Sequence, residues 1–393
     1  MSDSSTPEVP VRLPGSGSEP TAPPPSVDDV TGLLRAVVDP ELGADIVELG
    51  MVRRVDVRPS GDVRVEVALT IAGCPLRAQI RSDVVNRLES HNGVRSVQVD
   101  WGEMTSEQRS DVMARARRKA ADNAPDTEVP AATRVLAVAS GKGGVGKSSV
   151  TVNVAAALAS RGLTVGVLDA DIWGFSVPRM LGVEDRLVAH EGKIHPIEKK
   201  VGGGLLKIVS TGLIVEAEET ALMWRGLMLT KAVEQFLRDV RWGDMDYLLV
   251  DLPPGTGDVQ MGLSRLLPRA EMIIVTTPAL AAQKVAIRAA DMARRSYLRV
   301  VGVIENMTAF TCEHGTTYEL FGSGGGGALA HDVGVALLGQ VPMETAVAAG
   351  GDNGEPVAIA GTSPAAEAFC AIADLLIAQA APPFDAASCT ATA

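Results

Sequence analysis

The sequence predicts an α/β fold in two parts, a small α+β domain followed by a larger domain with a doubly wound, mostly parallel sheet. Two observations predict the larger domain. From residue 134 onward, short apolar runs alternate with helix-like segments, and near-continuous apolar runs are typical of parallel strands buried on both faces. In addition, residues 141–148 read G-K-G-G-V-G-K-S between a strand-like run and a helix-like run. That setting distinguishes a phosphate-binding loop from a chance match.

Composition narrows the class of protein. The 393 residues suggest two or three domains, and 46% hydrophobic with 3% aromatic residues implies a core of Val, Leu, Ile and Ala. The formal net charge of −12 argues against general binding of nucleic acid or of an anionic membrane. No apolar run approaches the ~20 residues that a spanning helix needs. We therefore expect neither a nucleic-acid nor a membrane partner.

The cysteines indicate the compartment. The four of them, Cys74, Cys312, Cys370 and Cys389, are too few and too scattered for a disulfide scaffold. The N-terminal residues lack the basic start and apolar stretch of a secretory signal. A reducing, cytoplasmic location is the natural expectation.

Shifts in composition divide the chain into five parts. We expect a disordered tail at 1–26, the small domain at 27–101, a helical linker at 102–132, the larger domain at 133–381 and a loose tail at 382–393. In the small domain the pattern predicts helices at 27–38 and 75–88 and strands at 52–57, 63–70 and 94–100. A further helix is predicted at 105–123, where Thr105 and Gln108 fit a capping box.

The larger domain is predicted from its apolar runs. Strands are expected at 134–139, 164–168, 206–210, 247–250, 272–276, 300–304 and 336–339, with helical crossovers between them. Such alternation predicts a doubly wound sheet with its ligand site at the carboxyl ends of the strands.

The glycine-rich loop predicts a P-loop ATPase. Its glycines let backbone N–H groups converge on phosphate oxygens, and the following helix N-terminus adds partial positive charge. Lys147 is expected to reach the β- and γ-phosphates, and Ser148 to hold Mg²⁺. The residues expected to bind ATP in this loop are Gly141, Lys142, Gly143, Gly144, Val145, Gly146, Lys147, Ser148 and Ser149.

Two later strands end in aspartates. Asp169 and Asp171 close one strand and Asp251 closes another, so all three are expected beside the P-loop. Asp169 and Asp251 would hold Mg²⁺ directly or through water, and Asp171 would orient the attacking water. The alternative for any one of them is a helix N-cap. No glutamine is obviously placed to orient water, so slow hydrolysis is expected.

Lys142 is a second lysine, placed early in the loop. It is either an exposed loop cation or a lysine that reaches a phosphate in a facing subunit and stabilises the charge of the transferring phosphoryl group. The loop resembles that of the deviant Walker A ATPases, which include MinD, ParA and nitrogenase iron protein. The resemblance implies a homodimer with catalytic Lys142 and Lys147 acting beside Asp171 and Asp251.

Further motifs narrow the resemblance. They are D-A-D-I-W-G-F-S-V-P at 169–178, W-R-G at 224–226, D-L-P-P-G-T-G-D at 251–258, E-N-M at 305–307 and F-G-S-G-G-G at 321–326. Together they are similar to the Mrp family of iron–sulfur cluster carrier ATPases over residues 134–380. This resemblance implies ATP-dependent transfer of clusters to apoprotein clients, with iron–sulfur assembly factors as partners. It also implies that Asn306 contacts the adenine, although Asn306 may be read instead as a turn-stabilising residue.

The small domain carries its own resemblance. D-P-E-L-G at 39–43, E-L-G-M-V at 48–52 and T-I-A-G-C-P at 70–75 are similar to the MIP18 (DUF59) domain of iron–sulfur assembly. Cys74 comes just before a predicted helix, whose dipole would favour its thiolate. It is either a reactive or ligating thiol or a buried, inert one.

The cluster site departs from the family pattern. Mrp-type carriers usually offer a C-x-x-C pair, and the corresponding residues here are Cys312 and Gly315. A dimer would then supply two Cys312 thiolates and two His314 imidazoles, which can replace thiolates on a cluster iron. The resemblance implies a [4Fe–4S] cluster, whereas the departure also allows a relic loop. Cys370 lies in an apolar helical pattern and is expected in the core, and Cys389 could reach as an extra ligand.

Two alternative functions remain at this point. One is a nucleotide-gated assembly scaffold without a cluster. The other is a MinD- or ParA-like positioning ATPase, which would need a membrane-targeting helix or a basic DNA surface.

Overall fold

The computed structural model describes residues 22–39, 42, 44–69, 77–122, 124–171, 174–213, 226–255, 257–296, 298–360 and 362–379. The chain divides into two compact units, Met1–Asp122 and Asn123–Ala393. The boundary falls inside the predicted linker.

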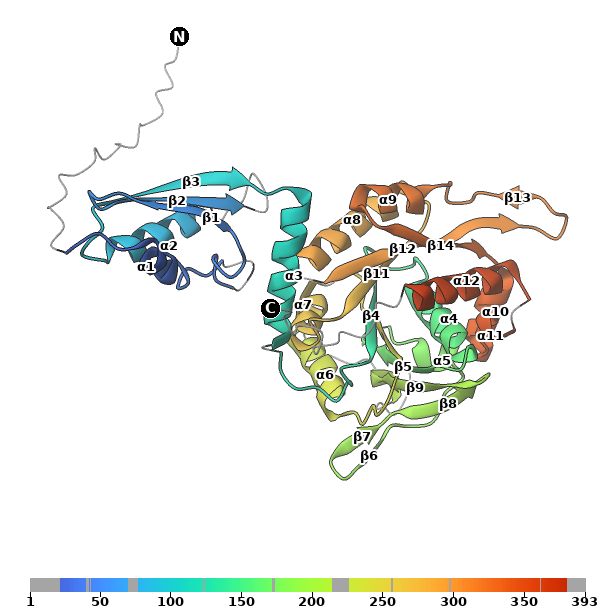
Figure 1. Ribbon diagram of the computed structural model, residues 1–393. Coiled ribbons are helices and arrows are strands. Elements are labelled where there is room, and N and C mark those ends of the chain that lie inside the picture. The colour runs from blue at the N-terminus through green and yellow to red at the C-terminus, as the bar shows by residue number, and fades with distance from the viewer. Residues whose placement is uncertain are drawn as a thin grey trace, which may run out of the picture. The chain divides into compact units, whose positions relative to one another are not determined.

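The first unit is built on a three-stranded sheet of β1 (Val52–Val57), β2 (Asp62–Leu69) and β3 (Ser96–Glu103). β1 and β2 are antiparallel, whereas β2 and β3 are parallel. The parallel pair needs a crossover, which is α2 (Arg77–Glu89). Helix α1 (Val27–Leu34) packs against α2 and buries Val30 and Leu34 (Figure 1).

Helix α1 is shorter than predicted. The sequence pattern extends the helix to residue 38, but α1 ends at Leu34 and Val38 instead forms a β-bridge with Asp45. Asp39 precedes a proline in the sequence, and a residue before proline is disfavoured in helical conformation. Val37 is buried and Val38 is exposed, and neither belongs to a further turn of α1.

Helix α3 (Ser106–Asp122) begins with the predicted capping box. The amide of Gln108 donates to Thr105 Oγ1 at 3.2 Å, and the amide of Thr105 donates to Gln108 Oε1 at 3.1 Å. Lys119 near its end forms ion pairs with Glu48 and, at 3.7 Å, with Asp45. These contacts attach the helix to the first unit.

The second unit contains a nine-stranded sheet. Its order is β13-β12-β11-β4-β10-β5-β9-β8, and β14 pairs with β12 beside this path. The strands are β4 (Arg134–Ser140), β5 (Thr164–Asp169), β8 (Ile197–Val201), β9 (Gly204–Ser210), β10 (Tyr247–Asp251), β11 (Glu271–Thr276), β12 (Arg299–Thr311), β13 (Thr317–Tyr318) and β14 (Ala336–Met343). Their pairs are parallel except β8–β9 and β12–β13. A separate ribbon joins β6 (Val188–His190) and β7 (Lys193–His195).

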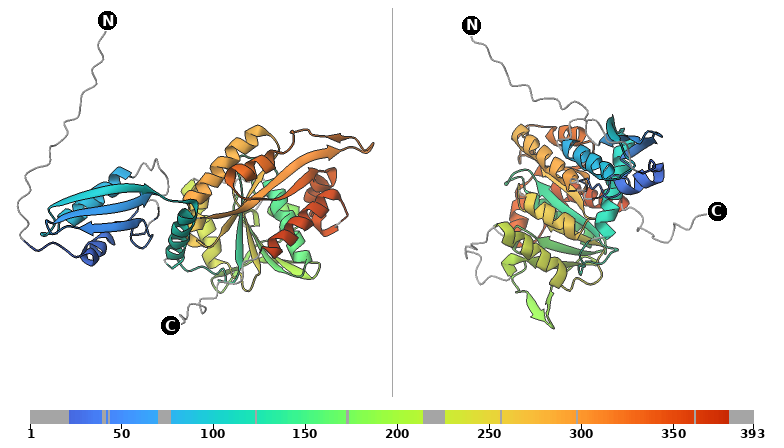
Figure 2. Two further views of the ribbon diagram at one scale, coloured as in Figure 1. Left: turned by 45° about the horizontal axis from the view of Figure 1, so that its top comes forward. Right: turned by 90° about the vertical axis from the view of Figure 1, so that its left-hand side faces the viewer.

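Helices cover both faces of this sheet (Figure 2). Alternate residues of the central strand β4 enter two different cores: Leu136 and Val138 pack with one cluster, and Val135 and Ala137 with the other. The first cluster includes α4 (Lys147–Ser160) and α12 (Pro364–Ala378). The second includes α6 (Gly226–Asp239), α7 (Gly257–Leu266), α8 (Leu280–Arg295) and α9 (Gly325–Val333). The predicted doubly wound, mostly parallel sheet is confirmed.

Two features of the sheet were not predicted from the sequence. The antiparallel edge strands β8 and β13 are short and partly polar, so they carry no buried-strand pattern. Strand β12 was predicted to end at residue 304 but continues to Thr311, because pairing with β14 and β13 extends it through polar residues such as Glu305 and Asn306.

Candidate functional site

The P-loop joins β4 to α4, and its glycines are required by close approach. A Cβ on Gly141 would lie 2.4 Å from a backbone carbon of Val285 in α8. Gly146 has a φ of +78° and caps α4, and a Cβ there would lie 2.2 Å from Asn306 Nδ2. The loop therefore packs closely against α8 and β12, and its last residues lead directly into the start of α4.

A cavity of about 210 Å³ lies in front of this loop. Besides the loop residues, Asp171, Ser176, Met180 and Pro254 line it. Because the first amides of a helix have no partner within the helix, the start of α4 presents N–H groups and partial positive charge to this space. Such a cavity suits the phosphates of a nucleotide.

Asp251 is the centre of the hydrogen bonding behind the loop. Lys147 Nζ lies 2.6 Å from its Oδ1, Ser148 Oγ donates to its Oδ2 at 2.6 Å, and Thr151 Oγ1 donates to its Oδ1 at 2.8 Å. The side chains of Lys147 and Asp251 are 6% and 1% exposed, so this ion pair is buried. Thr151 was not predicted, although its spacing of one helical turn from Lys147 places both on the same face of α4.

Asp169 lies beside Asp251, because β5 and β10 pair in parallel with these two residues as partners. Its Oδ1 accepts from the amide of Asp171 at 3.1 Å. Its Oδ2 accepts from the amides of Ser176 and Val177 at 3.2 and 3.3 Å and from Ser210 Oγ at 3.1 Å. Ser210 was not predicted from the sequence, since a serine that ends a strand carries no distinctive signal.

The electrostatics of this pair fit a divalent cation. Burial, and then the neighbouring Asp251 carboxylate, raise the pKa of Asp169 to about 7 against the opposing effect of Lys147. Two buried carboxylates thus share one ammonium group, which leaves negative charge uncompensated. Carboxylate and hydroxyl oxygens are the ligands that Mg²⁺ prefers. Ser148, Asp169 and Asp251 therefore form a suitable donor set.

The other predicted loop residues lie as follows. Asp171 lines the cavity and is partly buried. Lys142 is exposed, and its carbonyl accepts from Ser140 Oγ at 3.0 Å. That position is compatible with either reading of Lys142, so the trans-acting lysine stays a prediction.

Asn306 contacts the P-loop itself. It is 6% exposed, and its Nδ2 donates to the carbonyl of Val145 at 2.9 Å. The preceding Glu305 is buried and accepts from the amide of Gly326 at the start of α9 at 2.7 Å. The E-N-M motif therefore ties β12 both to the loop and to α9, and the adenine contact of Asn306 stays a prediction.

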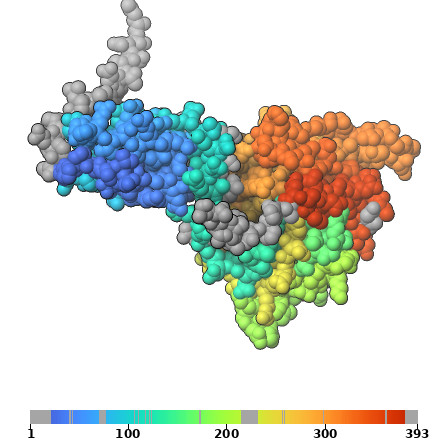
Figure 3. All heavy atoms as spheres, viewed as in Figure 1, coloured from blue at the N-terminus to red at the C-terminus, as the bar shows by residue number. Residues whose placement is uncertain are grey.

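Cys312 lies in a tight turn at the end of β12. The turn is closed by the amide of Gly315, which donates to the Cys312 carbonyl at 2.9 Å, and by the Cys312 amide, which donates to Thr316 at 3.0 Å. The backbone N–H groups of His314 and then of Thr316 lower the pKa of the Cys312 thiol, which favours the thiolate that binds metals. The hairpin of β12 and β13 projects from the sheet (Figure 1), and the same orange region forms a protrusion in the space-filling view (Figure 3).

The remaining cysteines and histidine do not join Cys312 in the described structure. His314 is exposed. Cys370 is half-buried against the core, as predicted, with its sulfur 3.8 Å from the Ala358 carbonyl. Cys74 and Cys389, like most of the W-R-G motif, lie outside the described residues. Among the residues that are described, no three His, Cys, Asp or Glu side chains are grouped to hold a metal ion.

Within the described parts of the chain, no helix has both the length and the apolar character to cross a membrane.

Comparison with known proteins places both units in families. Residues 131–377 match the model of the NUBPL iron-transfer P-loop NTPases, and residues 27–101 match that of the iron–sulfur cluster assembly proteins. A relative from Mycobacterium bovis, named iron–sulfur cluster carrier protein, is 47% identical over 334 residues, which cover 83% of this chain and 86% of the relative. One of the same name from Deinococcus radiodurans is 43% identical over 357 residues, covering 90% and 95%.

The chain was also compared with solved structures. A nucleotide-binding protein from Archaeoglobus fulgidus, in complex with ADP, is 30% identical with a TM-score of 0.48, covering 61% of this chain and 91% of that one. The family models and the curated relatives are sufficient to assign the chain. It belongs to the family of iron-transfer P-loop NTPases, with a domain of the iron–sulfur cluster assembly type before the NTPase domain.

Proposed function

We propose that this protein is a cytoplasmic ATPase that carries iron–sulfur clusters and transfers them to apoproteins. The observation that carries the proposal is the joint presence of both family domains in one chain together with the Lys147–Asp251 centre behind the P-loop. The names of the relatives support the cargo. Client proteins and assembly factors are the partners that such a cargo requires.

Each residue of the centre has a proposed task in ATP hydrolysis. The amides of the loop and Lys147 bind the phosphates, as the helix N-terminus favours. Ser148, Asp169 and Asp251 would hold Mg²⁺ directly or through water, and the ion would neutralise charge on the phosphoryl oxygens. Asp171 lines the cavity and orients the attacking water. Thr151 and Ser210 hold the two buried carboxylates in place.

We further propose that the working form is a homodimer in which Lys142 acts on the nucleotide of the facing subunit. Its exposure on the loop supports this proposal. Lys142→Ala and Lys147→Ala should each abolish hydrolysis, measured as phosphate release at saturating ATP. Lys147→Ala should also lose nucleotide affinity, whereas Lys142→Ala should retain it. Normal turnover by the Lys142→Ala protein would contradict the trans-acting lysine.

The cluster, proposed as [4Fe–4S], would bind at Cys312. Its thiol has a lowered pKa and lies in the turn between β12 and β13. His314 is proposed as an additional ligand, and Cys74 as a thiol for cluster exchange. The position of Gly315, where the family usually has a second cysteine, favours a second candidate function, a nucleotide-gated assembly scaffold that holds no cluster.

Anaerobic reconstitution distinguishes the two functions. Wild-type protein, Cys312→Ala and Cys370→Ala would be treated with iron and sulfide, desalted, and measured for visible absorbance and iron content. The carrier proposal expects stoichiometric iron in the wild type and in Cys370→Ala, and its loss in Cys312→Ala. Equal iron in all three proteins would remove Cys312 from the site, and iron in none of them would favour the scaffold.

A further inference from the structure

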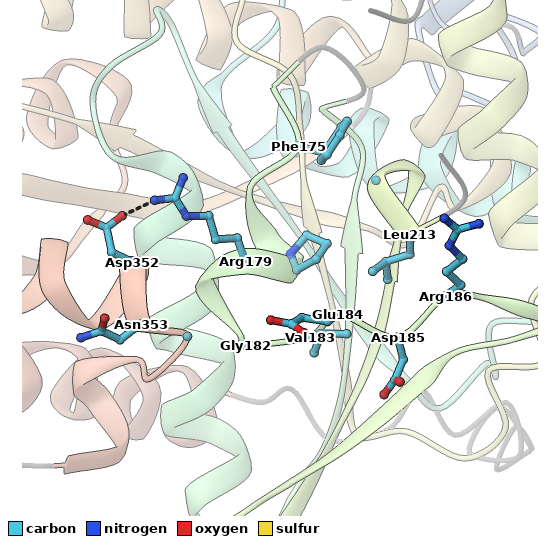
Figure 4. A pocket seen from close by; sticks show the side chains of 13 residues that line it. Phe175, Arg179, Gly182, Val183, Glu184, Asp185, Arg186, Leu213, Asp352 and Asn353 are labelled. Carbon is cyan, nitrogen blue, oxygen red and sulfur yellow. Dashed lines mark hydrogen bonds and ion pairs between the residues drawn. The ribbon is translucent and has the colours of Figure 1, made fainter. Parts of the chain in front are cut away.

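A second cavity lies on the other side of the chain segment that borders the nucleotide pocket. Its volume is about 410 Å³, within the ~300–1,000 Å³ typical of ligand sites. Figure 4 shows its lining, which includes Phe175 and Arg179 on one side and Asp352 across from them. The proposed ATPase reaction does not use this space, although Phe175 and Pro178 in its lining belong to the motif at 169–178.

The two cavities share a wall. Residues 174–180, here called the shared segment, include the short helix α5 (Val177–Met180). Ser176 and Met180 of this segment line the nucleotide pocket, whereas Phe175, Pro178 and Arg179 line the second cavity. A displacement of the shared segment therefore changes both spaces.

The opposite wall of the second cavity is connected by hydrogen bonds to Asp169, the same carboxylate that accepts from the shared segment. It includes Gly212 and Leu213 of the 3₁₀ turn η1 (Thr211–Leu213). The amide of Gly212 donates to Ser210 Oγ at 3.1 Å, and that hydroxyl donates to Asp169 Oδ2. Asp169 Oδ2 also accepts from the amides of Ser176 and Val177. Asp169, at the nucleotide centre, thus holds both walls of the second cavity.

Close packing makes this connection stiff. A Cβ on Gly212 would lie 2.3 Å from Phe175 Cδ2, so the turn lies directly against the ring of the shared segment. On the third side, the C-terminal end of α10 (Thr345–Asn353) reaches the shared segment through Arg179, whose Nη2 lies 2.8 Å from Asp352 Oδ1 (Figure 4). The contact between Gly212 and Phe175 is close-packed and transmits a displacement rather than absorbing it, whereas the Arg179–Asp352 pair is an exposed ion pair.

The charges of the lining define the ligand. Arg179 is paired with Asp352, and Arg186 also has an interaction partner. Glu184 and Asp185 line the cavity, and among the residues that the structure describes neither has a hydrogen-bond or ion-pair partner. The available charge is therefore negative. Apolar side chains of Pro178, Val183 and Leu213 complete the lining and suit the hydrocarbon stem of a long cation.

We propose that this cavity binds an organic cation with an apolar stem, and that the binding is coupled to nucleotide binding through the shared segment and Asp169. The cation is a lysine or arginine side chain on a partner peptide or a free polyamine, which offer the same chemistry. The coupling, but not the cation binding, rests on the proposed ATPase function.

Direct binding is measured first, on the full-length protein without nucleotide. The probes are acetyl-Leu-Arg-Leu-amide, spermidine and the neutral acetyl-Leu-Gln-Leu-amide, titrated by calorimetry. Binding of the arginine peptide or of spermidine, but not of the neutral peptide, supports the proposal and identifies the source of the cation. Binding of neither cation overturns it.

A charge-matched pair of variants then tests the location. Glu184→Gln/Asp185→Asn removes both unpaired carboxylates and should weaken cation binding about fivefold or more. The control, Glu191→Gln/Glu355→Gln, removes two exposed carboxylates that do not line the cavity and should leave the affinity unchanged. Equal weakening by both double variants would show general attraction to an acidic surface and would overturn the site.

The coupling is measured by repeating the titration with saturating ADP. Linked sites usually change each other's affinity by about 5- to 150-fold, and the factor is reciprocal. The affinity for the cation should therefore change at least fivefold with ADP, and the affinity for ADP should change by the same factor with the cation. ADP binding without either change would overturn the coupling. A wild-type protein that binds the cation but no ADP would contradict the ATPase proposal and leave the cation site supported.

Discussion

Asp251 and Cys312 are both proposed metal-binding residues, yet their surroundings differ completely. Asp251 is fully buried and accepts hydrogen bonds or an ion pair from Lys147, Ser148 and Thr151. Cys312 is partly exposed on a projecting turn whose hydrogen bonds are local. The first environment penalises any change, because a buried polar group that loses its partner costs free energy. The second has open space around it, and glycine suits position 315 because its φ of +78° is one that other residues rarely adopt.

The largest expected effect comes from removing the ammonium of the buried centre. Lys147→Ala leaves Asp169 and Asp251 without their counter-charge and should lower the free energy of unfolding by about 3–5 kcal/mol. Thermal unfolding of the nucleotide-free protein measures this. Adding Asp251→Asn to the same variant should recover part of the loss, because one buried charge is then removed. An unchanged Tm in Lys147→Ala would show that the centre is not under electrostatic strain.

The free energy of unfolding should depend on pH because of Asp169, the second carboxylate of this centre. The pKa of Asp169 is raised from its ordinary value of 3.8 to about 7, so the folded state binds the proton more tightly than the unfolded state. The stability that Asp169 contributes is therefore present below about pH 4 and lost as the pH rises to about 7. Asp169→Asn cannot ionise, so its Tm relative to the wild type should rise between pH 5 and pH 8. A constant difference would contradict the raised pKa.

Two buried threonines of the second unit test how much the hydrogen bond to Asp251 contributes to stability. Thr151 donates to Asp251, whereas Thr211 Oγ1 is buried with no hydrogen-bond partner among the described residues. Thr151→Val should cost about 1–3 kcal/mol of stability, because Asp251 loses a donor. Thr211→Val, of the same shape, should be neutral or stabilising. Urea unfolding of both variants measures the difference, and equal costs would mean that the hydrogen bond to Asp251 contributes nothing.

The smallest stability effect is expected at the Cys312 turn. Gly315 has a φ of +78°, and a Cβ there meets nothing within 4 Å. Gly315→Cys and Gly315→Ala should therefore cost the same backbone strain, about 1 kcal/mol. Gly315→Cys alone should raise iron content after anaerobic reconstitution, because it adds a second thiolate. Equal iron in the two variants would show that position 315 does not face the cluster.

Much of the fold follows from local patterns. Central strands of the large sheet such as β4 and β10 were predicted because each is apolar and buried on both faces, and the capping box of Thr105 and Gln108 formed as its spacing predicts. Helix α1 ended before the predicted residue 38 because Val38 pairs with Asp45, a contact between separate segments that the apolar pattern does not report. The antiparallel edges β8 and β13 were missed for the same reason, since an edge strand is defined by its neighbour.

By itself the sequence predicted that residues 141–148 bind phosphate, since glycine and lysine at that spacing have few other uses, and it placed Asp169 and Asp251 at strand ends. Only the tertiary structure decided that Thr151 and Ser210 hold these carboxylates, that Asn306 donates to Val145, and that the shared segment separates two cavities. The physical reason is that covalent spacing fixes which groups a loop or helix presents. A hydrogen bond such as that between Asn306 and Val145, which are 161 positions apart, exists only after the sheet has aligned its strands.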